Sequence, residues 1–481
     1  MSLAARPDRQ GETVTETGAI EPRALDRGTS LWCAKQLDRL EECPSYRRLG
    51  KVEKVVGLVI EAAGPQVSIG DMCHIIVRGR KRLQAEVVGF REKKVLLMPL
   101  DVTAGIEPGS TVDLLDEPYS VRVGRELLGR VLDGTGRPMD GKGPLNCRER
   151  RPVHNMPPNA LTRERVTKPI TTGVRVLDGL LTCGLGQRLG IFAGSGVGKS
   201  VLLGMLARNS NADINVIALI GERGREVRDF LERDLGEEGL KRSVVVTVTS
   251  EQAALVRVKG AMVATAIAEY FADLGLNVLL MMDSLTRVAM AQREVGLAVG
   301  EPPTTKGYTP SVFAMLPRLL ERAGNFARGS ITGMYTVLVE GDDMNDPVAD
   351  TVRSILDGHI VLSRKLASAG HYPSVDVLQS ISRVMVDVCE SHHVTHANAI
   401  KELLAVYHDA EDLINIGAYA PGSNRRIDCA LAMIDDITNF QRQDMFEKTS
   451  LRQAHDHVSR LSLSSYELAE EFARTKPAAE A

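Results

Sequence analysis

Short apolar runs alternate with longer amphipathic stretches through the middle of the chain. Six runs are short and continuously apolar, as strands buried on both faces of a parallel sheet tend to be. These predicted strands cover residues 188–193, 214–220, 243–248, 277–282, 331–339 and 359–363. Helical patterns lie between them, for example over 224–235 and 252–274. The alternation predicts an α/β domain with a largely parallel sheet.

The two ends of the chain carry different patterns. From about residue 50 to 118, short β-rich runs recur between turn signals, which predicts a small all-β barrel or sandwich. The runs are 55–60, 73–77, 85–90 and 95–98. Beyond about residue 380 the pattern is helical, for example over 397–407 and 427–442.

These patterns divide the chain into five segments. The first residues are polar and lack apolar periodicity, which indicates a flexible arm, and a Gly/Pro-rich stretch marks a connector between two domains. The predicted segments are the arm 1–25, the N-terminal β-barrel domain 26–118, the connector 119–165, the α/β domain 166–378 and the C-terminal helical domain 379–481.

Length and charge limit the classes of function. A chain of 481 residues is too long for one hydrophobic core, and its net charge of −3 provides no overall attraction to nucleic acid, so we expect no nucleic-acid partner. No stretch approaches the roughly 20 apolar residues that cross a bilayer, and the N-terminus lacks the apolar segment of a signal peptide. We therefore expect a cytoplasmic protein, with peripheral membrane contact at most.

Seven cysteines are scattered along the chain without a Cys-x-x-Cys pair. Their odd number and spacing indicate neither a zinc site nor a disulfide framework. We expect them to be reduced and without a chemical role.

The most specific motif is Ala-Gly-Ser-Gly-Val-Gly-Lys-Ser at residues 193–200, between a predicted strand and a predicted helix. This is the context of a phosphate-binding loop, although the generic motif opens with Gly where this chain has Ala193. The glycines let consecutive N–H groups converge on phosphate oxygens at the positive end of the helix. The predicted nucleotide-binding residues are Ala193, Gly194, Ser195, Gly196, Val197, Gly198, Lys199, Ser200 and Val201. Lys199 would reach the β- and γ-phosphates and the Ser200 hydroxyl would bind Mg²⁺.

Two carboxylates are expected near this loop. Asp283 directly follows the apolar run 277–282. If that strand lies beside the loop strand, Asp283 stands at the carboxyl edge of the sheet and can hold Mg²⁺ through a water. Glu222 follows the strand ending at Ile220 and reaches the same edge, where it can orient the attacking water or cap a helix. For Glu226 we expect the capping role.

Several motifs together resemble those of the flagellar protein export ATPases, over roughly residues 50–440. They are Gly194–Ser200, Gly221–Val227, Asp283–Arg287, Gly300–Tyr308, Tyr335–Asp343, Ile355–Ile360 and Ser380–Arg383. These ATPases are related to the catalytic subunits of rotary ATP synthases and to virulence-type type III secretion ATPases. Ala193 fits this resemblance, because the export ATPases have Phe-Ala before Gly-Ser-Gly.

The resemblance implies a RecA-like P-loop domain between the barrel and the helical domain, and it assigns roles at matching positions. Lys199 and Ser200 look like the phosphate and metal ligands, and Asp283 like the acidic residue on the metal side. Glu222 looks like the catalytic carboxylate. Arg383 looks like the arginine finger that enters the neighbouring subunit's site, and Tyr372 resembles the aromatic residue that packs on adenine.

The resemblance also implies an ATPase that works as a homohexamer at the cytoplasmic face of the inner membrane and couples ATP hydrolysis to protein export. Its implied partners are a regulator bound at the arm 1–25, a central stalk protein, the export gate, export substrates and chaperones. The loop 300–313, which contains Lys306 and Tyr308, either faces a central pore or is an ordinary subunit contact.

Three alternatives remain at this point. A virulence-type secretion ATPase would also hydrolyse ATP, but it would serve a virulence-type type III secretion system in place of the flagellar one. A non-catalytic nucleotide-binding subunit is disfavoured by the presence of both Glu222 and Arg383 in one chain. An RNA-dependent hexameric helicase is disfavoured because the N-terminal β-runs carry no interleaved basic and aromatic surface.

Overall fold

The computed structural model describes residues 32, 35–37, 49–77, 81–101, 104–115, 117–339, 341 and 343–474. The predicted arm, residues 1–25, lies outside the described residues. None of the described helices is long and apolar enough to cross a membrane.

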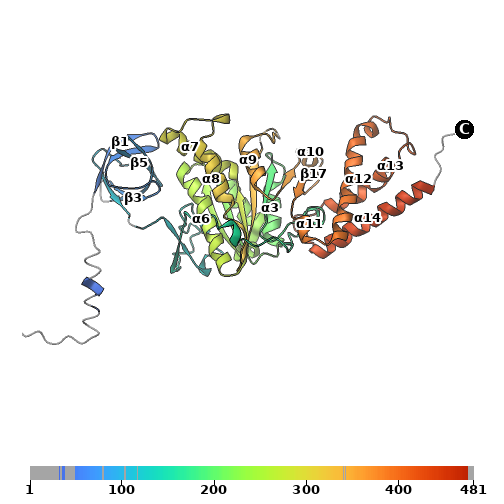
Figure 1. The fold of residues 1–481 in the computed structure, drawn as a ribbon, viewed down its shortest axis with the longest axis horizontal. Helices are drawn as coiled ribbons and strands as arrows, with labels where there is room; N and C mark the ends of the chain where they lie inside the picture. Colours follow the sequence, from blue (N-terminus) through green and yellow to red (C-terminus); the bar gives the residue numbers. More distant parts are fainter. Residues whose placement is uncertain are drawn as a thin grey trace, which may run out of the picture. The chain divides into compact units, whose positions relative to one another are not determined.

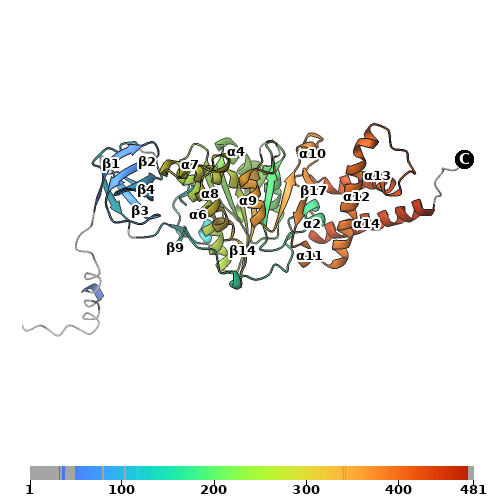
Figure 2. The same cartoon turned by 45° about the horizontal axis from the view of Figure 1, so that its top comes forward.

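Residues 50–114 form a closed six-stranded barrel, so of the two predicted all-β folds the barrel is confirmed. Its strands follow the order β1-β2-β5-β4-β3-β6, and the barrel is the blue domain in Figure 2. They are β1 (Gly50–Val56), β2 (Val59–Ala63), β3 (Met72–Ile76), β4 (Arg82–Arg91), β5 (Lys94–Pro99) and β6 (Thr111–Leu114). The predicted single strand 55–60 is wrong, because Gly57 (φ 59°) turns the chain between β1 and β2.

A sheet of nine strands among the described residues forms the centre of the next domain (Figure 1). Its path is β17-β16-β10-β15-β13-β11-β12-β8, and β14 pairs with β15. The strands are β8 (Val131–Leu132), β10 (Arg188–Ala193), β11 (Ile214–Glu222), β12 (Ser243–Thr249), β13 (Asn277–Asp283), β14 (Gly324–Asn325), β15 (Ser330–Leu338), β16 (Gly358–Leu362) and β17 (Val375–Ser382). The six strands expected from continuous apolar runs are all present, and their mutual pairing is parallel, as predicted.

Two details of the sheet differ from expectation. The strand β13, which ends in Asp283, does not lie beside the loop strand β10, because β15 is inserted between them and pairs with both. The chain also adds an antiparallel edge strand, β17, next to β16. The expected domain boundary between residues 378 and 379 falls inside this strand.

Helices cover both faces of the sheet because successive strand residues point to opposite sides. Along β11, Val216, Ala218 and Ile220 belong to one core, and Ile217 and Leu219 belong to another. The first core includes α6 (Ala254–Asp273), α7 (Leu285–Val299), α8 (Pro310–Leu320) and α9 (Pro347–Ile355), and the second includes α2 (Arg175–Leu180) and α3 (Lys199–Asn209). The predicted helix 224–235 is interrupted, since α4 (Gly224–Asp229) passes into a π-helical segment, η4 (Phe230–Leu235), before α5 (Gly236–Lys241).

The C-terminal region is helical, as predicted. After the short helices α10 (Arg364–Ser368) and α11 (Met385–Val388), three long helices pack against one another (Figure 1). They are α12 (Ser391–Asn415), α13 (Arg425–Gln441) and α14 (Leu451–Arg474). Helix α14 also contacts α2, which ties the helical region to the sheet domain.

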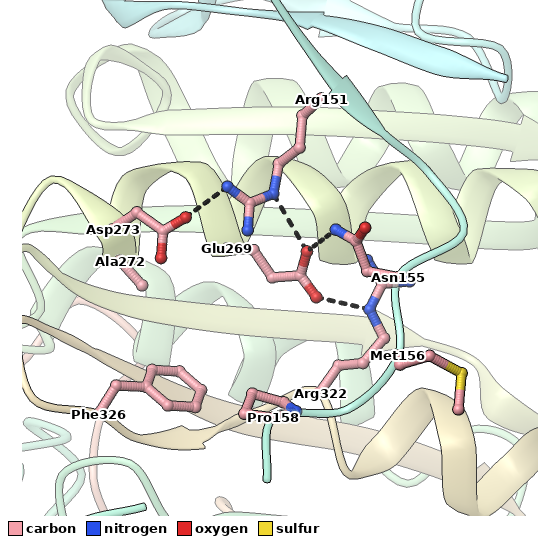
Figure 3. Close-up of a pocket in the computed structure, with 9 residues that line it drawn as sticks. All are labelled: Arg151, Asn155, Met156, Pro158, Glu269, Ala272, Asp273, Arg322 and Phe326. Atoms are coloured by element: carbon pink, nitrogen blue, oxygen red, sulfur yellow. Dashed lines mark hydrogen bonds and ion pairs between the residues drawn. The ribbon is translucent and has the colours of Figure 1, made fainter. Parts of the chain in front are cut away.

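A cluster around Glu269 fastens the connector to helix α6 (Figure 3). Arg151, at the end of a short ribbon formed by β7 (Ser120–Val123) and β9 (Glu149–Pro152), donates to Glu269 Oε2 at 3.2 Å. Asn155 donates to the same oxygen at 2.7 Å, and the buried Arg322 donates to Oε1 at 2.6 Å. These residues line a small pocket, but their charges pair with one another, so we assign it no ligand.

Removing this carboxylate should destabilise the domain. Glu269→Ala is expected to lower the free energy of unfolding by about 3–5 kcal/mol, because Arg322 would stay buried without its partner. Asp273→Asn is the control, since Asp273 pairs with Arg151 on an exposed surface and such pairs contribute about 0–1 kcal/mol. Calorimetry of the sheet domain's unfolding transition measures both; equal losses would contradict the account.

Candidate active site

The loop after β10 has the backbone that phosphate binding requires. Gly196 and Gly198 have φ of 78° and 87°, values that residues with a Cβ rarely adopt, and Gly198 directly precedes helix α3. Val197 is buried in the core, and its carbonyl accepts a hydrogen bond from Ser374 at 2.6 Å. The loop is therefore held at its centre while the residues on either side face outward.

A pocket of about 760 Å³ opens over this loop. Its lining includes every predicted nucleotide-binding loop residue except the buried Val197. The full lining is Ala193, Gly194, Ser195, Gly196, Gly198, Lys199, Ser200, Val201, Gly221, Glu222, Arg223, Glu226, Ser250, Arg287, Leu338, Val339, Gly341 and Arg364. Four of these side chains are cationic and two are acidic, so the pocket suits an anion.

Lys199 joins the two predicted carboxylates. Its ammonium lies 2.5 Å from Asp283 Oδ1 and 3.5 Å from Glu222 Oε1. Burial acts to lower the pKa of Lys199, but the charges of Asp283 and Glu222 outweigh it and hold that pKa above its ordinary value. The structure thus brings together three of the predicted site residues, each from the carboxyl edge of the sheet or the loop beside it.

Asp283 is held by the strand that separates it from β10. Thr336 on β15 donates its hydroxyl hydrogen bond to Asp283 Oδ1 at 2.7 Å, and the Asp283 side chain is almost fully buried. Both described bonds end on Oδ1, and Oδ2 makes none with the described residues. The inserted strand therefore orients the carboxylate that we expected to stand next to the loop strand.

The pKa of Glu222 is raised well above the ordinary value of a glutamate. Burial raises its pKa to about 7; the charge of Asp283 also raises the pKa, while Lys199 opposes the shift. A hydrogen bond to Glu226 further favours the protonated form of Glu222 and lowers the pKa of Glu226. Glu226 also accepts from the Arg223 backbone N–H at 3.3 Å, so its predicted capping role is confirmed.

Tyr372 lies beside the loop but outside the pocket lining. A Cβ added at Gly198 would stand 3.2 Å from the Tyr372 ring, so glycine permits this close approach. The ring is 45% exposed. Tyr372 precedes β17, which begins at Val375 opposite the end of β16, and its half-exposed ring lies next to the phosphate-binding loop.

Arg383 lies far from this pocket. Because β17 runs antiparallel to β16, its last residue, Ser382, pairs with Gly358 at the beginning of β16. Arg383 follows Ser382 at this opposite edge of the sheet, and its backbone N–H donates to Asp357. A six-residue strand such as β10 spans roughly 20 Å, so the exposed Arg383 cannot reach its own chain's loop.

Three arginines of the pocket were not predicted as site residues: Arg223, Arg287 and Arg364. Arg287 follows Asp283 by four residues, about one helical turn, which is the signal that could have placed it at the same edge. Its Nε is buried without a hydrogen-bond partner among the described residues. Arg223 adjoins Glu222, whereas Arg364 reaches the pocket only through the fold.

The loop 300–313 is partly helical, since α8 begins at Pro310. Tyr308 is only 4% exposed and packs between Phe313 and Arg293, so its ring is not available to a central pore in this conformation. Lys306 is half-exposed and pairs with Asp343 at 3.1 Å.

Family models match three successive parts of the chain and define its class. The ATP synthase alpha/beta family nucleotide-binding domain matches residues 173–382, and the beta-barrel domain of the same family matches residues 52–115. The C-terminal domain of the type III secretion ATPase EscN matches residues 389–459. The fold and the loop pocket are thus those of a nucleotide-binding ATPase of the ATP synthase alpha/beta class.

Individual relatives narrow the class to a family. The flagellum-specific ATP synthase of Bacillus subtilis is 57% identical over 87% of this chain and 96% of its own length, and the type 3 secretion system ATPase of Xanthomonas euvesicatoria is 53% identical over 82% and 90%. The chain therefore belongs to the family of flagellum-specific ATP synthases and type 3 secretion system ATPases.

Solved structures of this family agree with the fold. The assembled ATPase EscN from enteropathogenic E. coli superposes with a TM-score of 0.82 at 46% identity, over 86% of this chain and all of that one. The same ATPase in complex with its central stalk EscO superposes with a TM-score of 0.80 at 45% identity, over 86% and 100%.

The hydrogen bond from Thr336 to Asp283 should be needed for fast ATP hydrolysis. Thr336→Val keeps the shape and removes a bond to a charged group, worth about 1.5–3 kcal/mol, so kcat/KM should fall at least about tenfold. Thr247→Val is the matched control, because the buried Thr247 hydroxyl has no partner among the described residues. Phosphate-release kinetics would contradict the account if the two variants behaved alike.

Proposed function

We propose that this chain is the ATP hydrolase of a flagellar protein export apparatus, acting as a homohexameric ring. The observation that carries the proposal is the pocket in which Lys199, Glu222 and Asp283 meet above the phosphate-binding loop. The 57% identity to a flagellum-specific ATP synthase supports the flagellar assignment.

The phosphate-binding loop and Lys199 bind the phosphates. The N–H groups of residues 194–199 surround the start of α3, where the helix dipole favours negative charge. Lys199 now neutralises two carboxylates; a bound triphosphate offers it a stronger partner, and the ammonium then contacts the β- and γ-phosphates. Arg223, Arg287 and Arg364 add positive charge around the same anion.

The residues present fit a magnesium ion beside the phosphates. Ser200 is exposed at the first turn of α3, and Asp283 keeps Oδ2 free of bonds to the described residues. A hydroxyl and a carboxylate oxygen are ligands that Mg²⁺ accepts, with phosphate oxygens and waters completing its shell. When bound, the ion neutralises charge that develops on the β- and γ-phosphate oxygens.

Glu222 is the residue that we assign to the attacking water. Its carboxylate reaches the pocket from the end of β11, and in the ionised form it can accept a hydrogen bond from water and orient it toward the γ-phosphorus. Displacement of Lys199 toward the phosphates leaves Glu222 free for this role. Tyr372, beside Gly198, is positioned to pack against the adenine.

Arg383 completes the site only across a subunit boundary. It stands at the opposite edge of the sheet from its own phosphate-binding loop. An arginine finger in the nucleotide site raises the rate of hydrolysis by roughly 10³–10⁵-fold, so a complete site needs such a residue. We therefore place it in the site of the next subunit, which makes the ring necessary for hydrolysis. That a relative was solved as an assembled ATPase, and with a central stalk, supports this arrangement.

The remaining partners follow from the same proposal. The ring would contact a central stalk, the export gate, export substrates and chaperones, and it would act in the cytoplasm, peripherally at the inner membrane. A regulator would bind the arm 1–25, which lies outside the described residues. Deleting the arm should abolish regulator binding.

A virulence-type secretion ATPase is the second candidate, favoured by the 53% identity to a type 3 secretion system ATPase. Deletion of the gene in its own host separates the two. A flagellar ATPase predicts loss of swimming, restored by the wild-type chain but not by Lys199→Ala or Glu222→Gln at equal protein levels. Normal swimming with loss of effector secretion would select the second candidate.

The purified variants provide the biochemical part of that test. Both should lose ATP hydrolysis, but Glu222→Gln should keep more nucleotide binding than Lys199→Ala, because of these two side chains only the lysine contacts the phosphates. Binding of a fluorescent ATP analogue measures this difference. Wild-type hydrolysis by either variant would refute the assignment.

Hydrolysis should rise with pH through about 7. The pKa of Glu222 is raised above its ordinary value, so the carboxylate that orients water is present only above that pKa and is lost as the pH falls through it. The pH profile of kcat/KM should show this midpoint. Glu226→Gln keeps a side chain that can cap the helix and removes a charge that raises the pKa, so its midpoint should move to lower pH. A flat profile in both proteins would contradict the role of Glu222.

A further inference from the structure

Three side chains of types that can bind a metal ion lie together in the C-terminal helical region. None of them belongs to the nucleotide pocket. Cys389 directly follows α11, His393 lies in the first turn of α12, and His455 lies in the second turn of α14. One ligand atom from each lies within 4.8 Å of the others. Thiolate sulfur and imidazole nitrogen are ligands that zinc prefers.

His393 is the most unusual member of this cluster. The residue is only 1% exposed, and neither ring nitrogen makes a hydrogen bond of ordinary geometry with the described residues, although one of them approaches the backbone of Gly179. A buried polar group without a partner costs free energy, and such groups are rare in folded proteins. The ring stacks on His455 with centroids 3.5 Å apart and planes 13° apart, so its nitrogens lie next to the other two ligands.

His455 is already held as metal-binding histidines usually are. Its Nε2 lies 3.1 Å from the backbone carbonyl oxygen of Asp178, and a carbonyl only accepts, so Nε2 carries the proton. The lone pair is therefore on Nδ1. Metal-bound histidines almost always donate their other ring N–H to such a backbone or carboxylate partner.

Neighbouring histidines are distinguished from this cluster by their surroundings. His396 contacts the Ser459 hydroxyl at 2.9 Å, and the exposed His392 lies 3.2 Å from Glu390. His457 packs edge-on against Phe440. Among the described histidines, only His393 combines deep burial with two ring nitrogens that make no well-formed hydrogen bond inside a group of possible ligands.

We propose that Cys389, His393 and His455 bind one Zn²⁺ ion, with a water as its fourth ligand. Binding removes the proton from the Cys389 thiol, so each zinc bound releases one proton to solvent and leaves a thiolate–zinc bond. The ion would give a nitrogen of His393 the partner that no well-formed hydrogen bond among the described residues supplies. This inference does not rest on the proposed function, since it uses none of the nucleotide-site residues.

Binding requires a small rearrangement. Ligand atoms around tetrahedral zinc lie about 3.4–3.6 Å apart, given bonds of about 2.0–2.3 Å. The present separations reach at most 4.8 Å, so the ligands must close by about 1 Å at the widest. The two stacked rings must also tilt, because lone pairs in parallel ring planes do not point to one ion. Both movements require rotation about side-chain bonds.

This site could not be predicted from the sequence, because the spacing of its residues is not that of a known zinc motif. Cys389 and His393 are four residues apart across the start of α12, and His455 follows more than sixty residues later. This proposal therefore replaces the expectation that no cysteine of this chain binds zinc.

Titration of the full-length protein with Co²⁺ tests the proposal directly. The protein is freed of metal with a chelator and kept in excess Mg²⁺, which occupies the oxygen ligands of the nucleotide site. One Co²⁺ per chain should bind and show thiolate-to-cobalt absorption together with the visible bands of tetrahedral cobalt. Zn²⁺ should displace it.

Substitutions identify the ligands. Cys389→Ala should abolish the thiolate absorption and weaken zinc binding by more than about 100-fold, beyond the loss that a supporting residue causes. His455→Asn should weaken zinc binding similarly, and circular dichroism reports whether each variant is folded. Cys429→Ala is the matched control, because Cys429 lies in the same helical region outside the cluster.

Two results would overturn the proposal. The first is the absence of thiolate-to-cobalt absorption in the wild-type protein. The second is wild-type zinc affinity in folded Cys389→Ala or His455→Asn. Loss of the absorption in Cys389→Ala with its retention in Cys429→Ala would establish the site.

Discussion

The buried ammonium of Lys199 is the interaction on which the arrangement of the nucleotide site depends. It lies between Asp283 and Glu222, two carboxylates that come from separate strands and would repel each other without it. Because a buried charge requires a partner, the lysine keeps both acids in place before nucleotide binds. In the proposed mechanism, a triphosphate that attracts the lysine would free both carboxylates in one movement, Asp283 for the metal and Glu222 for water.

The direction of the edge strand β17 explains why we propose that one chain does not make a complete site. Its start brings Tyr372 beside the phosphate-binding loop, and its end carries Arg383 to the opposite edge of the sheet. A parallel strand in the same place would have ended near the loop. The antiparallel direction of β17 is the structural reason for proposing that neighbouring subunits share each site, and in this proposal it links the chemistry of hydrolysis to assembly of the ring.

Much of the central domain could be predicted because buried parallel strands are continuous apolar runs and the loop motif is local. The edge strand β17 was not predicted, because its exposed positions interrupt the apolar pattern. Strand order is also not local, so the insertion of β15 between β10 and Asp283 had to be seen in the fold. The same holds for the site: the loop and Glu222 follow from sequence, whereas Arg364 and the approach of His455 to Cys389 depend on tertiary packing.

Mixing two inactive variants tests the shared site most directly. Lys199→Ala lacks the phosphate ligand but keeps Arg383, and Arg383→Ala keeps the loop but lacks the arginine. In mixed rings assembled from equal amounts, about one quarter of the sites would combine an intact loop with an intact arginine from the next subunit. The account predicts that each variant alone hydrolyses almost no ATP and that the mixture recovers activity. No recovery in rings that have exchanged subunits, or full activity of Arg383→Ala alone, would contradict it.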